Sequence, residues 1–423
     1  MSEADWRHKL IALPSEKLRV GDALRFTLRD EQGRVLLAKG LRIEDRNDLD
    51  RLKARKRIFV EYEESDEAVK VLMQGFTEAD KHDAPLGELD RYISLGAADG
   101  EGRSRLDIPS DMAQAWGQLE QRLSGLLTTL GQFGPHGADA LERLSSQVVP
   151  MLDALLQHDR DAALCVLFHR SITGFTGYSA MHALQSAAVC HALSGPLKLS
   201  ATEDAALVKA ALTMNVAMKS LQDVLATQKV QLSPAQRTQI DWHPREGVRL
   251  LKAAGVTDAL WLDTVHKHHT EFPAGTPLAN LEPADKLAKI LQVVDRYTAA
   301  LSPRMSRAGR DGKEATRAAV IQAGSTQKDE VGMALMIMLG LHPAGTFVKL
   351  ASGETAVVLK KGLKPNEPVV ATVLNKRDEP VLEPKVRNTA APEHAVVHGL
   401  SGSSVKVRLN LELLLKLMRS ARP

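Results

Sequence analysis

The sequence predicts a mainly α protein, in which a helical bundle follows a small α+β module and precedes a small β-rich module. Three observations favour this fold class. Apolar residues make up 44% of the 423 residues, which is enough for a sizeable core, whereas aromatic residues make up only 4%. Alanine and leucine, both strong helix formers, are abundant. Between residues 110 and 340 the apolar positions recur at helical spacing, and the alternation typical of strands lies nearer the two ends.

The N-terminal α+β module is predicted over residues 1–70. Short strands separated by the turn signal Asp30–Gly33 come first, followed by a helix at Asp45–Lys56 and a strand at Arg57–Tyr62. Residues 71–108 are rich in Gly, Asp and Ala and have no periodicity, so they are predicted to form a linker.

A helical segment is predicted over residues 109–172, ahead of the main domain. Helices are expected at 110–134 and 138–157, because leucines recur at helical spacing in both. In the first helix the apolar stripe consists of Leu119, Leu123, Leu126 and Leu130. Such a stripe is more often a packing face of a bundle core than a surface for a partner or a second copy.

The main helical domain is predicted over residues 173–341. An N-cap signal at Ser200–Glu203 and breaks at Leu232–Pro234 and Gly255–Thr257 divide this region into helices. The pattern changes over residues 342–423, which are predicted to form the β-rich module. There "GTFVKLASGETAVVLKK" alternates apolar and polar residues around a Ser-Gly turn and predicts a β-hairpin. An amphipathic helix, Leu409–Met418, is expected to close the module.

Charge and cysteine content exclude several classes of protein. The formal net charge is +3 and no basic-aromatic patch is present, so we expect no nucleic-acid partner. The two cysteines, Cys165 and Cys190, provide no disulfide framework, which favours a reducing compartment. The N-terminus is polar, unlike a signal peptide, and the longest apolar run, Val331–Leu341, is too short to span a bilayer. We therefore expect a cytoplasmic protein without membrane contact.

Five candidate metal ligands lie in the helical region. Imidazole and carboxylate groups hold Fe, Mn or Zn, and facing helices of a bundle can project such groups inward. A single histidine proves little, because most histidines are structural or surface residues. The five candidates therefore count as a set: His182, His243, His268, His269 and Asp295.

The order of these residues resembles the HD-GYP domain, the bacterial branch of the HD phosphohydrolases, from about residue 175 to 350. His182 in "YSAMHALQSAA" resembles the family's first His, and His243-Pro244 in "DWHPREGVRLL" resembles its His-Pro element. "VHKHHTEFP" resembles the histidine doublet, and Asp295 in "VVDRYTAALSPRMSR" the final Asp. The modules at both ends also resemble those that flank such domains. The resemblance implies an HD-type helical bundle and a ligand of the cyclic di-GMP class.

The sequence departs from this family at the centre of the site. Met214-Asn215 stands where the family has His-Asp, Thr270 replaces the Glu after the doublet, and Gly-Tyr-Pro is shortened to Glu271-Phe272-Pro273. The family's Lys falls on Met218, with Lys219 one residue later. A carboxylate can bridge two cations, whereas an amide has one weak donor oxygen. A thioether suits soft Cu(I) better than hard Fe or Mn.

These departures change the metal chemistry that the resemblance implies. The first metal would be held by His182, Met214, Asn215 and Asp295, and the second by His243, His268 and His269. Only two good ligands remain for the first metal, while three imidazoles with an open position can form a mononuclear site. We therefore expect one divalent metal (Fe, Mn or Zn), no binuclear site and no catalytic residue at Met214 or Asn215. Losing one metal and its bridge costs many orders of magnitude in rate.

The sequence leaves three functions open. The first is a degenerate HD-GYP signalling protein that binds a nucleotide of the cyclic di-GMP class, or a protein partner, with little or no phosphodiesterase activity. The second is an active metal-dependent phosphodiesterase or phosphohydrolase with a rearranged mononuclear site. The third is an interaction module without a ligand. Arg304 and Arg307 match family arginines that would hold phosphates, although ordinary surface arginines are the alternative. A homodimer is also left open.

Overall fold

The computed structural model describes nine stretches of the chain, from Leu10 to Ala421. These stretches are residues 10–13, 27–30, 35–37, 58–61, 112–132, 137–174, 177–321, 326–407 and 409–421. The chain forms two compact units, Met1–Arg105 and Leu106–Pro423. The helix expected at Asp45–Lys56 and the linker expected at 71–108 lie outside the described residues.

The first unit contains a four-stranded antiparallel sheet with the order β1-β4-β2-β3. Its strands are β1 (Leu10–Leu13), β2 (Leu28–Arg29), β3 (Val35–Leu37) and β4 (Ile58–Glu61). β2 and β3 pair on either side of the turn signal that begins at Asp30, as the sequence predicts. The strand expected at Arg57–Tyr62 is present as β4.

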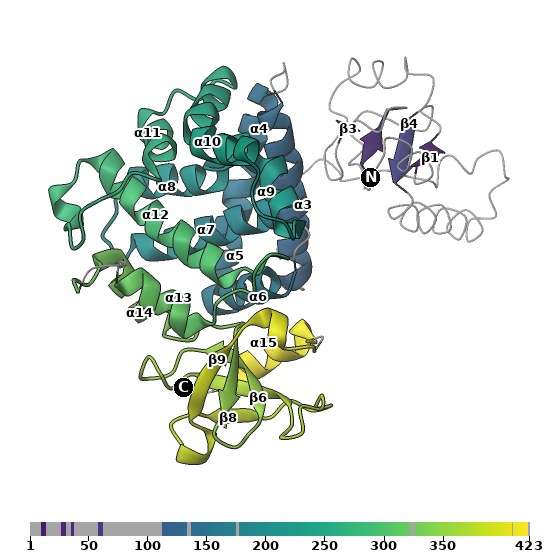
Figure 1. Ribbon diagram of the computed structural model, residues 1–423, viewed down its shortest axis with the longest axis vertical. Helices are drawn as coiled ribbons and strands as arrows, with labels where there is room; N and C mark the ends of the chain where they lie inside the picture. Colours follow the sequence, from purple (N-terminus) through teal and green to yellow (C-terminus); the bar gives the residue numbers. More distant parts are fainter. Residues whose placement is uncertain are drawn as a thin grey trace. The chain divides into compact units, whose positions relative to one another are not determined.

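A bundle of helices forms the larger part of the second unit, and the prediction of a mainly α fold is confirmed (Figure 1). Its α-helices are α3 (Met112–Gly131), α4 (Gly137–Arg143), α5 (Val149–His158), α6 (Arg160–Thr173), α7 (Tyr178–Ser194), α8 (Ala201–Thr213), α9 (Lys219–Thr227), α10 (Pro234–Ala253), α11 (Ala259–Lys267), α12 (Pro283–Leu301), α13 (Gly312–Val320) and α14 (Glu330–Leu339). None of the described helices combines the length and apolar character that crossing a bilayer requires.

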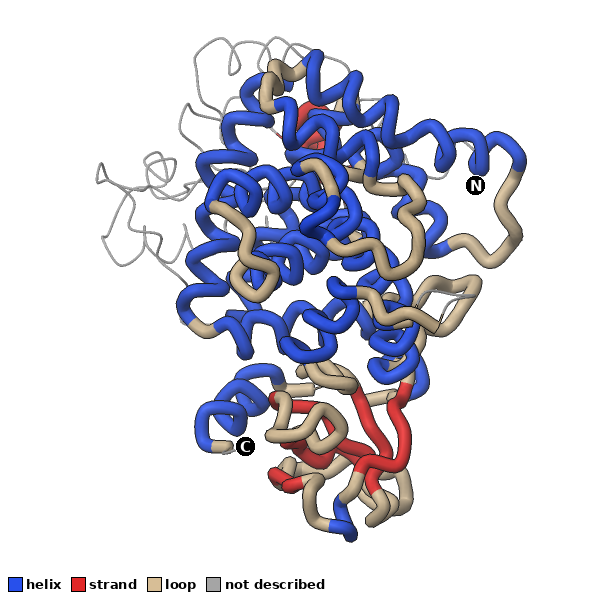
Figure 2. The backbone as a smooth tube through the Cα atoms, turned by 90° about the vertical axis from the view of Figure 1, so that its left-hand side faces the viewer, coloured by secondary structure: helices blue, strands red, loops and turns tan. Residues whose placement is uncertain are grey.

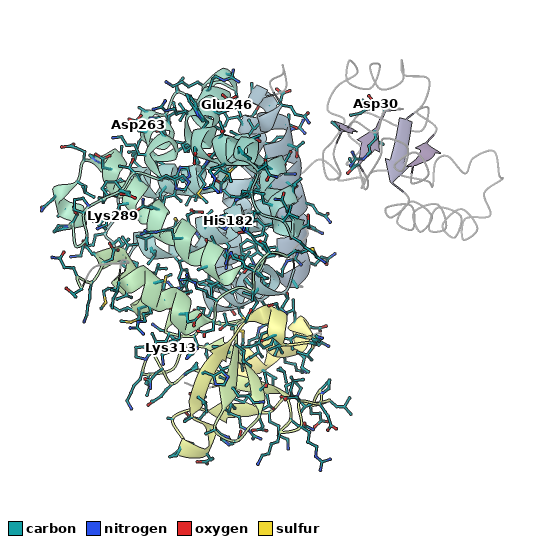
Figure 3. The ribbon with its side chains drawn as sticks, in the orientation of Figure 1. Asp30, His182, Glu246, Asp263, Lys289 and Lys313 are labelled. Carbon is teal, nitrogen blue, oxygen red and sulfur yellow. The ribbon has the colours of Figure 1, made fainter. Side chains whose placement is uncertain are left out.

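Helix α7 is the centre of the bundle. Every residue of α7 except His191 is buried, as expected for a helix covered on all sides. It packs against α3, α6, α8 and α12. The leucine stripe predicted on α3 is buried too, so its interpretation as a core packing face is confirmed. Figure 3 accordingly shows His182 inside the bundle, whereas Glu246 and Asp263 lie at its outer edge.

Capping residues fix where the helices of the site begin. Ser200 and Glu203 form a capping box at the start of α8, and Ser233 and Gln236 form another at the start of α10. The start of α8 agrees with the predicted N-cap signal, and α10 begins at the predicted break Leu232–Pro234. The Asp258 side chain accepts from Trp261 N at the start of α11, 3.1 Å away, and so sets the register of the histidine doublet at the other end.

The C-terminal module is a five-stranded antiparallel sheet with the order β8-β7-β6-β5-β9 and a helix packed on it. Figure 2 shows its strands gathered at one end of the helical bundle. The elements are β5 (Phe347–Leu350), β6 (Thr355–Lys360), β7 (Val369–Leu374), β8 (Val386–Asn388), β9 (Val396–Leu400) and α15 (Leu411–Ser420). The predicted hairpin is formed by β5 and β6, and the closing helix begins two residues later than expected.

The module joins the bundle through a close backbone approach at Gly345. Gly345 has φ +87°, and a Cβ there would lie 2.3 Å from the carbonyl oxygen of Cys165 in α6. The Gly345 carbonyl accepts a hydrogen bond from His169 Nδ1 at 3.4 Å, and the His169 ring contacts Phe347 edge-on. Only glycine combines this backbone conformation with this separation.

We expect Gly345→Ala to lower the free energy of unfolding by about 2–5 kcal/mol, because it adds a backbone clash to an unfavourable φ. Gly353→Ala is the matched control, since Gly353 has φ +85° but its nearest neighbour would be a flexible lysine side chain 3.7 Å away. That variant should lose only about 1 kcal/mol. Denaturant unfolding measures both losses, and equal losses would contradict the close approach.

Candidate metal centre

The three histidines of the second predicted metal site come from two adjacent elements. His243 lies in the middle of α10, His268 ends α11, and His269 follows it. The nitrogen atoms that they offer lie within 4.8 Å of one another. In the part of the chain that the structure describes, this is the one such group of three or more His, Cys, Asp or Glu side chains. The sequence spacing alone does not predict this convergence, because it depends on how α11 packs on α10.

Pro244 explains how His243 is oriented. In a helix, the N–H at position 244 would donate to the carbonyl of Ile240, but proline has no N–H. The Ile240 carbonyl is therefore left without its helical donor, and His243 Nδ1 donates to it at 2.5 Å. A carbonyl only accepts, so the proton sits on Nδ1 and the lone pair of a neutral ring on Nε2. Pro244 therefore orients the His243 ring, because it leaves the Ile240 carbonyl free to accept from Nδ1.

His268 is held in the same way at the end of α11. Its Nδ1 donates to the Val265 carbonyl at 2.7 Å. Burial lowers the pKa of His268 to about 3 and that of His243 to about 4, so both rings are neutral near pH 7. Their Nε2 atoms lie 3.2 Å apart. The lone pairs of these two Nε2 atoms therefore face each other in the interior of the bundle.

This arrangement fits a divalent metal ion. A cation between the two Nε2 atoms would turn their repulsion into attraction, and the carbonyl partners of Nδ1 fix the tautomer that metal ligation requires. The ring of the exposed His269 lies 5.1 Å from that of His243 and 4.1 Å from that of His268, between centroids. Three imidazoles would leave a coordination position for water or a ligand.

The loop after the doublet is fastened to α12 and α14, which holds His269 in place. Gln292 Nε2 donates to the Thr270 carbonyl at 2.6 Å. The buried Lys289 ammonium donates to the Thr276 carbonyl and pairs with Asp329 at 3.2 Å. Thr270 and Glu271 are both exposed, so neither supplies a buried ligand in place of the missing Glu.

His182 and Asp295 form a separate pair beside the triad. His182 Nε2 lies 2.7 Å from Asp295 Oδ1, which joins α7 to α12. Burial alone would raise the Asp295 pKa, but the hydrogen bond from His182, together with the neighbouring histidines, outweighs burial and holds it below its usual range. The Asp295 charge also offsets a small part of the lowering of the His243 pKa that burial causes. Asp295 therefore interacts electrostatically with the histidines of the triad.

Met214 and Asn215 lie where α8 ends. Met214 is fully buried, and its carbonyl lies close to Gly247 of α10. Asn215 is half-buried at the start of a short 3-10 turn, Val216–Met218. Lys219, the shifted substitute for the family's Lys, pairs with Asp223 on its own helix at 3.2 Å. This region thus offers an amide and a thioether where the resemblance requires charged or imidazole ligands.

The two predicted phosphate-binding arginines differ in their surroundings. The half-buried Arg304 guanidinium lies over the Tyr178 ring at 5.1 Å and donates to its hydroxyl at 3.1 Å. The Tyr178 ring is in turn stacked on His182, with 5.7 Å between centroids. Arg307 is exposed and donates to the Ala299 carbonyl at 2.6 Å. Arg304 is therefore tied to the His182 side of the site, and its phosphate role stays a prediction.

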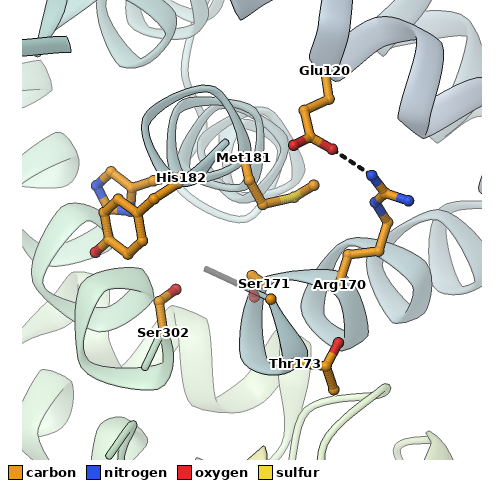
Figure 4. A pocket seen from close by; sticks show the side chains of 9 residues that line it. Glu120, Arg170, Ser171, Thr173, Met181, His182 and Ser302 are labelled. Carbon is orange, nitrogen blue, oxygen red and sulfur yellow. Dashed lines mark hydrogen bonds and ion pairs between the residues drawn. The ribbon is translucent and has the colours of Figure 1, made fainter. Parts of the chain in front are cut away.

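Sequence reasoning missed the side chains that border this site from outside the motifs. A pocket of about 220 Å³ lies beside His182, and its lining includes Glu120, Arg170 and Tyr178 (Figure 4). Glu120 belongs to α3 and Arg170 to α6, so both lie outside the motifs quoted from the sequence. Only the unusual position of charged residues within apolar helices could have drawn attention to them.

Comparison with known proteins gives one relevant similarity. The chain is 27% identical over 233 residues to a cyclic di-GMP phosphodiesterase of Pseudomonas aeruginosa. The match covers 53% of this chain and 52% of the relative, so the chain spans about half the length of the curated relative that it matches. This similarity supports the HD-GYP resemblance. No protein-family model and no solved structure matches the chain.

We expect Pro244→Ala to weaken Zn²⁺ binding by about 10- to 100-fold, the usual cost of disturbing a group that orients a metal-bound histidine. The new N–H would compete with His243 for the Ile240 carbonyl, while the helix itself would be at least as stable. Competition against a chromophoric chelator measures the affinity. Pro234→Ala, at the first turn of the same helix, is the control, and equal affinities in both variants would contradict the role of Pro244.

Proposed function

We propose that this chain is a signalling protein whose helical bundle holds one divalent metal ion at His243, His268 and His269. It binds a nucleotide of the cyclic di-GMP class and hydrolyses it little or not at all. The observation that carries the proposal is the pair of neutral Nε2 atoms of His243 and His268, 3.2 Å apart in a buried site. Two facing lone pairs favour the binding of a cation. The resemblance to the HD-GYP domain indicates the class of nucleotide.

The similarity to a cyclic di-GMP phosphodiesterase supports the choice of nucleotide. Arg304 adds a physical reason, because its guanidinium is positioned by Tyr178 beside His182 and can hold a phosphate with parallel hydrogen bonds. A protein partner is the other ligand that a signalling protein of this kind would take.

Weak hydrolysis follows from the charges around the site. In two-metal phosphodiester cleavage, the ions generate hydroxide and neutralise the charge that develops on the phosphate. Here Asn215 cannot bridge two ions with negative charge, and Met214 offers only a thioether. Asp295 is already paired with His182. Binding can therefore persist while transition-state stabilisation is lost.

A second candidate function is a phosphohydrolase with a mononuclear site. It is favoured by the three-histidine arrangement, which leaves an open coordination position as catalytic zinc sites do. The third candidate function, an interaction module without a ligand, predicts histidines that are scattered through the domain. The convergence of the triad argues against it.

Metal analysis and nucleotide assays on the purified full chain separate these functions. We expect about one metal ion per chain, loss of that ion in His268→Ala and its retention in His266→Ala, an exposed histidine on the same helix. Calorimetry should detect cyclic di-GMP binding and chromatography little product. Turnover at ordinary enzyme rates, about 1 s⁻¹ or more, would favour the phosphohydrolase instead.

Restoring the missing ligands tests the cause of the weak activity. We expect Met214→His combined with Asn215→Asp to bind a second metal ion and to raise hydrolysis of cyclic di-GMP by about 100-fold or more. Met214→Leu combined with Asn215→Ser changes the same positions without adding ligands and should leave hydrolysis unchanged. If restoration changes neither metal content nor rate, the loss of activity lies elsewhere.

A further inference from the structure

The pocket beside His182 is lined mainly by polar side chains, with Met181 among them. Figure 4 shows Glu120 and Arg170 on one side of it, His182 on the other and Met181 between them. Its volume of about 220 Å³ is below the roughly 300 Å³ at which pockets for drug-sized ligands begin. The pocket therefore suits a single ring system and not a whole dinucleotide.

Glu120 and Arg170 present acceptors and donors side by side. Arg170 Nη2 donates to Glu120 Oε2, and the side chains are 32% and 14% exposed, respectively. Arg170 Nε is buried and has no acceptor within the described residues. Glu120 Oε1 lies against the bare backbone of Gly177, where a Cβ would be only 2.6 Å away. The ion pair uses one nitrogen and one oxygen, so the second carboxylate oxygen and further guanidinium N–H groups remain for a ligand.

The charge balance at this edge leaves the carboxylate incompletely neutralised. Burial raises the Glu120 pKa above its usual value, and Arg170 offsets this only in part, while the nearby charge of Asp223 raises it further. A ligand that donates two hydrogen bonds to this carboxylate would relieve its cost of burial. The ligand must also offer an acceptor to the guanidinium beside it.

We propose that this pocket takes the guanine base of a nucleotide. The Watson–Crick edge of guanine carries N1–H and an amino group, which Glu120 would accept, next to a carbonyl oxygen, to which Arg170 would donate. Adenine presents an acceptor nitrogen in place of N1–H, and that nitrogen would repel the carboxylate. Met181 covers one face of the base. This inference rests on the proposed nucleotide-binding function and adds base specificity to it.

The position of the pocket agrees with a nucleotide that extends toward the metal centre. Tyr178 and His182 both line the pocket, and Arg304 lies over Tyr178. A base held by Glu120 and Arg170 would direct its sugar and phosphate along this wall, toward Arg304 and the pair of His182 and Asp295. One nucleotide could therefore contact both the base pocket and the phosphate-binding arginine.

Calorimetry with cyclic di-GMP and cyclic di-AMP on the full chain tests the inference. We expect the wild type to prefer cyclic di-GMP by about 10-fold or more, because a mismatched base leaves charged groups unpaired. Glu120→Gln replaces one acceptor oxygen by a donor and should remove the preference. Glu142→Gln, which changes an exposed glutamate of α4, is the matched control and should keep it.

A second variant guards against loss of folding in Glu120→Gln. Thr173 is exposed at the rim of the pocket, so Thr173→Trp should block the pocket and weaken cyclic di-GMP binding while thermal melting stays unchanged. Equal affinity of the wild type for both dinucleotides, equal effects of Glu120→Gln and Glu142→Gln, or full binding in Thr173→Trp would overturn the base pocket alone. Binding of neither dinucleotide would overturn the proposed nucleotide function and the base pocket together.

Discussion

The candidate site depends on one electrostatic constraint: two neutral imidazole rings direct their Nε2 lone pairs at each other across 3.2 Å. Burial keeps protons away from His243 and His268, and their carbonyl partners keep the remaining proton on Nδ1. Without a cation the contact is unfavourable, and with one it becomes a pair of metal bonds. The surrounding structure maintains this contact through Pro244, which frees the Ile240 carbonyl, and through the cap that fixes α11.

The two halves of the site differ in charge, and this difference decides what the site can do. His243 and His268 are neutral, and together with His269 they can take one dication. On the other side Asp295 is the charged candidate ligand, and it is engaged with His182. A second dication would require the negative bridge that Asn215 does not provide. The same asymmetry leaves room for binding functions, because Arg304 and the Glu120–Arg170 pair lie near His182.

The local features of the fold could be predicted from the sequence, since they depend on near neighbours. The leucine stripe of α3, the caps at Ser200 and Ser233 and the β5–β6 hairpin are of this kind. The site could be predicted only in part. The five candidate ligands came from an ordered resemblance, but spacing could not show that three converge while His182 and Asp295 pair separately. Glu120 and Arg170 were missed because their pairing joins helices that are distant in sequence.

X-ray absorption spectroscopy at the zinc edge of the Zn²⁺-loaded full chain tests the central claim most directly. The account predicts one zinc ion bound by three imidazole nitrogens at about 2.0–2.1 Å. It also predicts no metal–metal scattering near 3.5–4 Å, the separation found in two-metal sites. A clear metal–metal signal, or a zinc environment without imidazole, would contradict it.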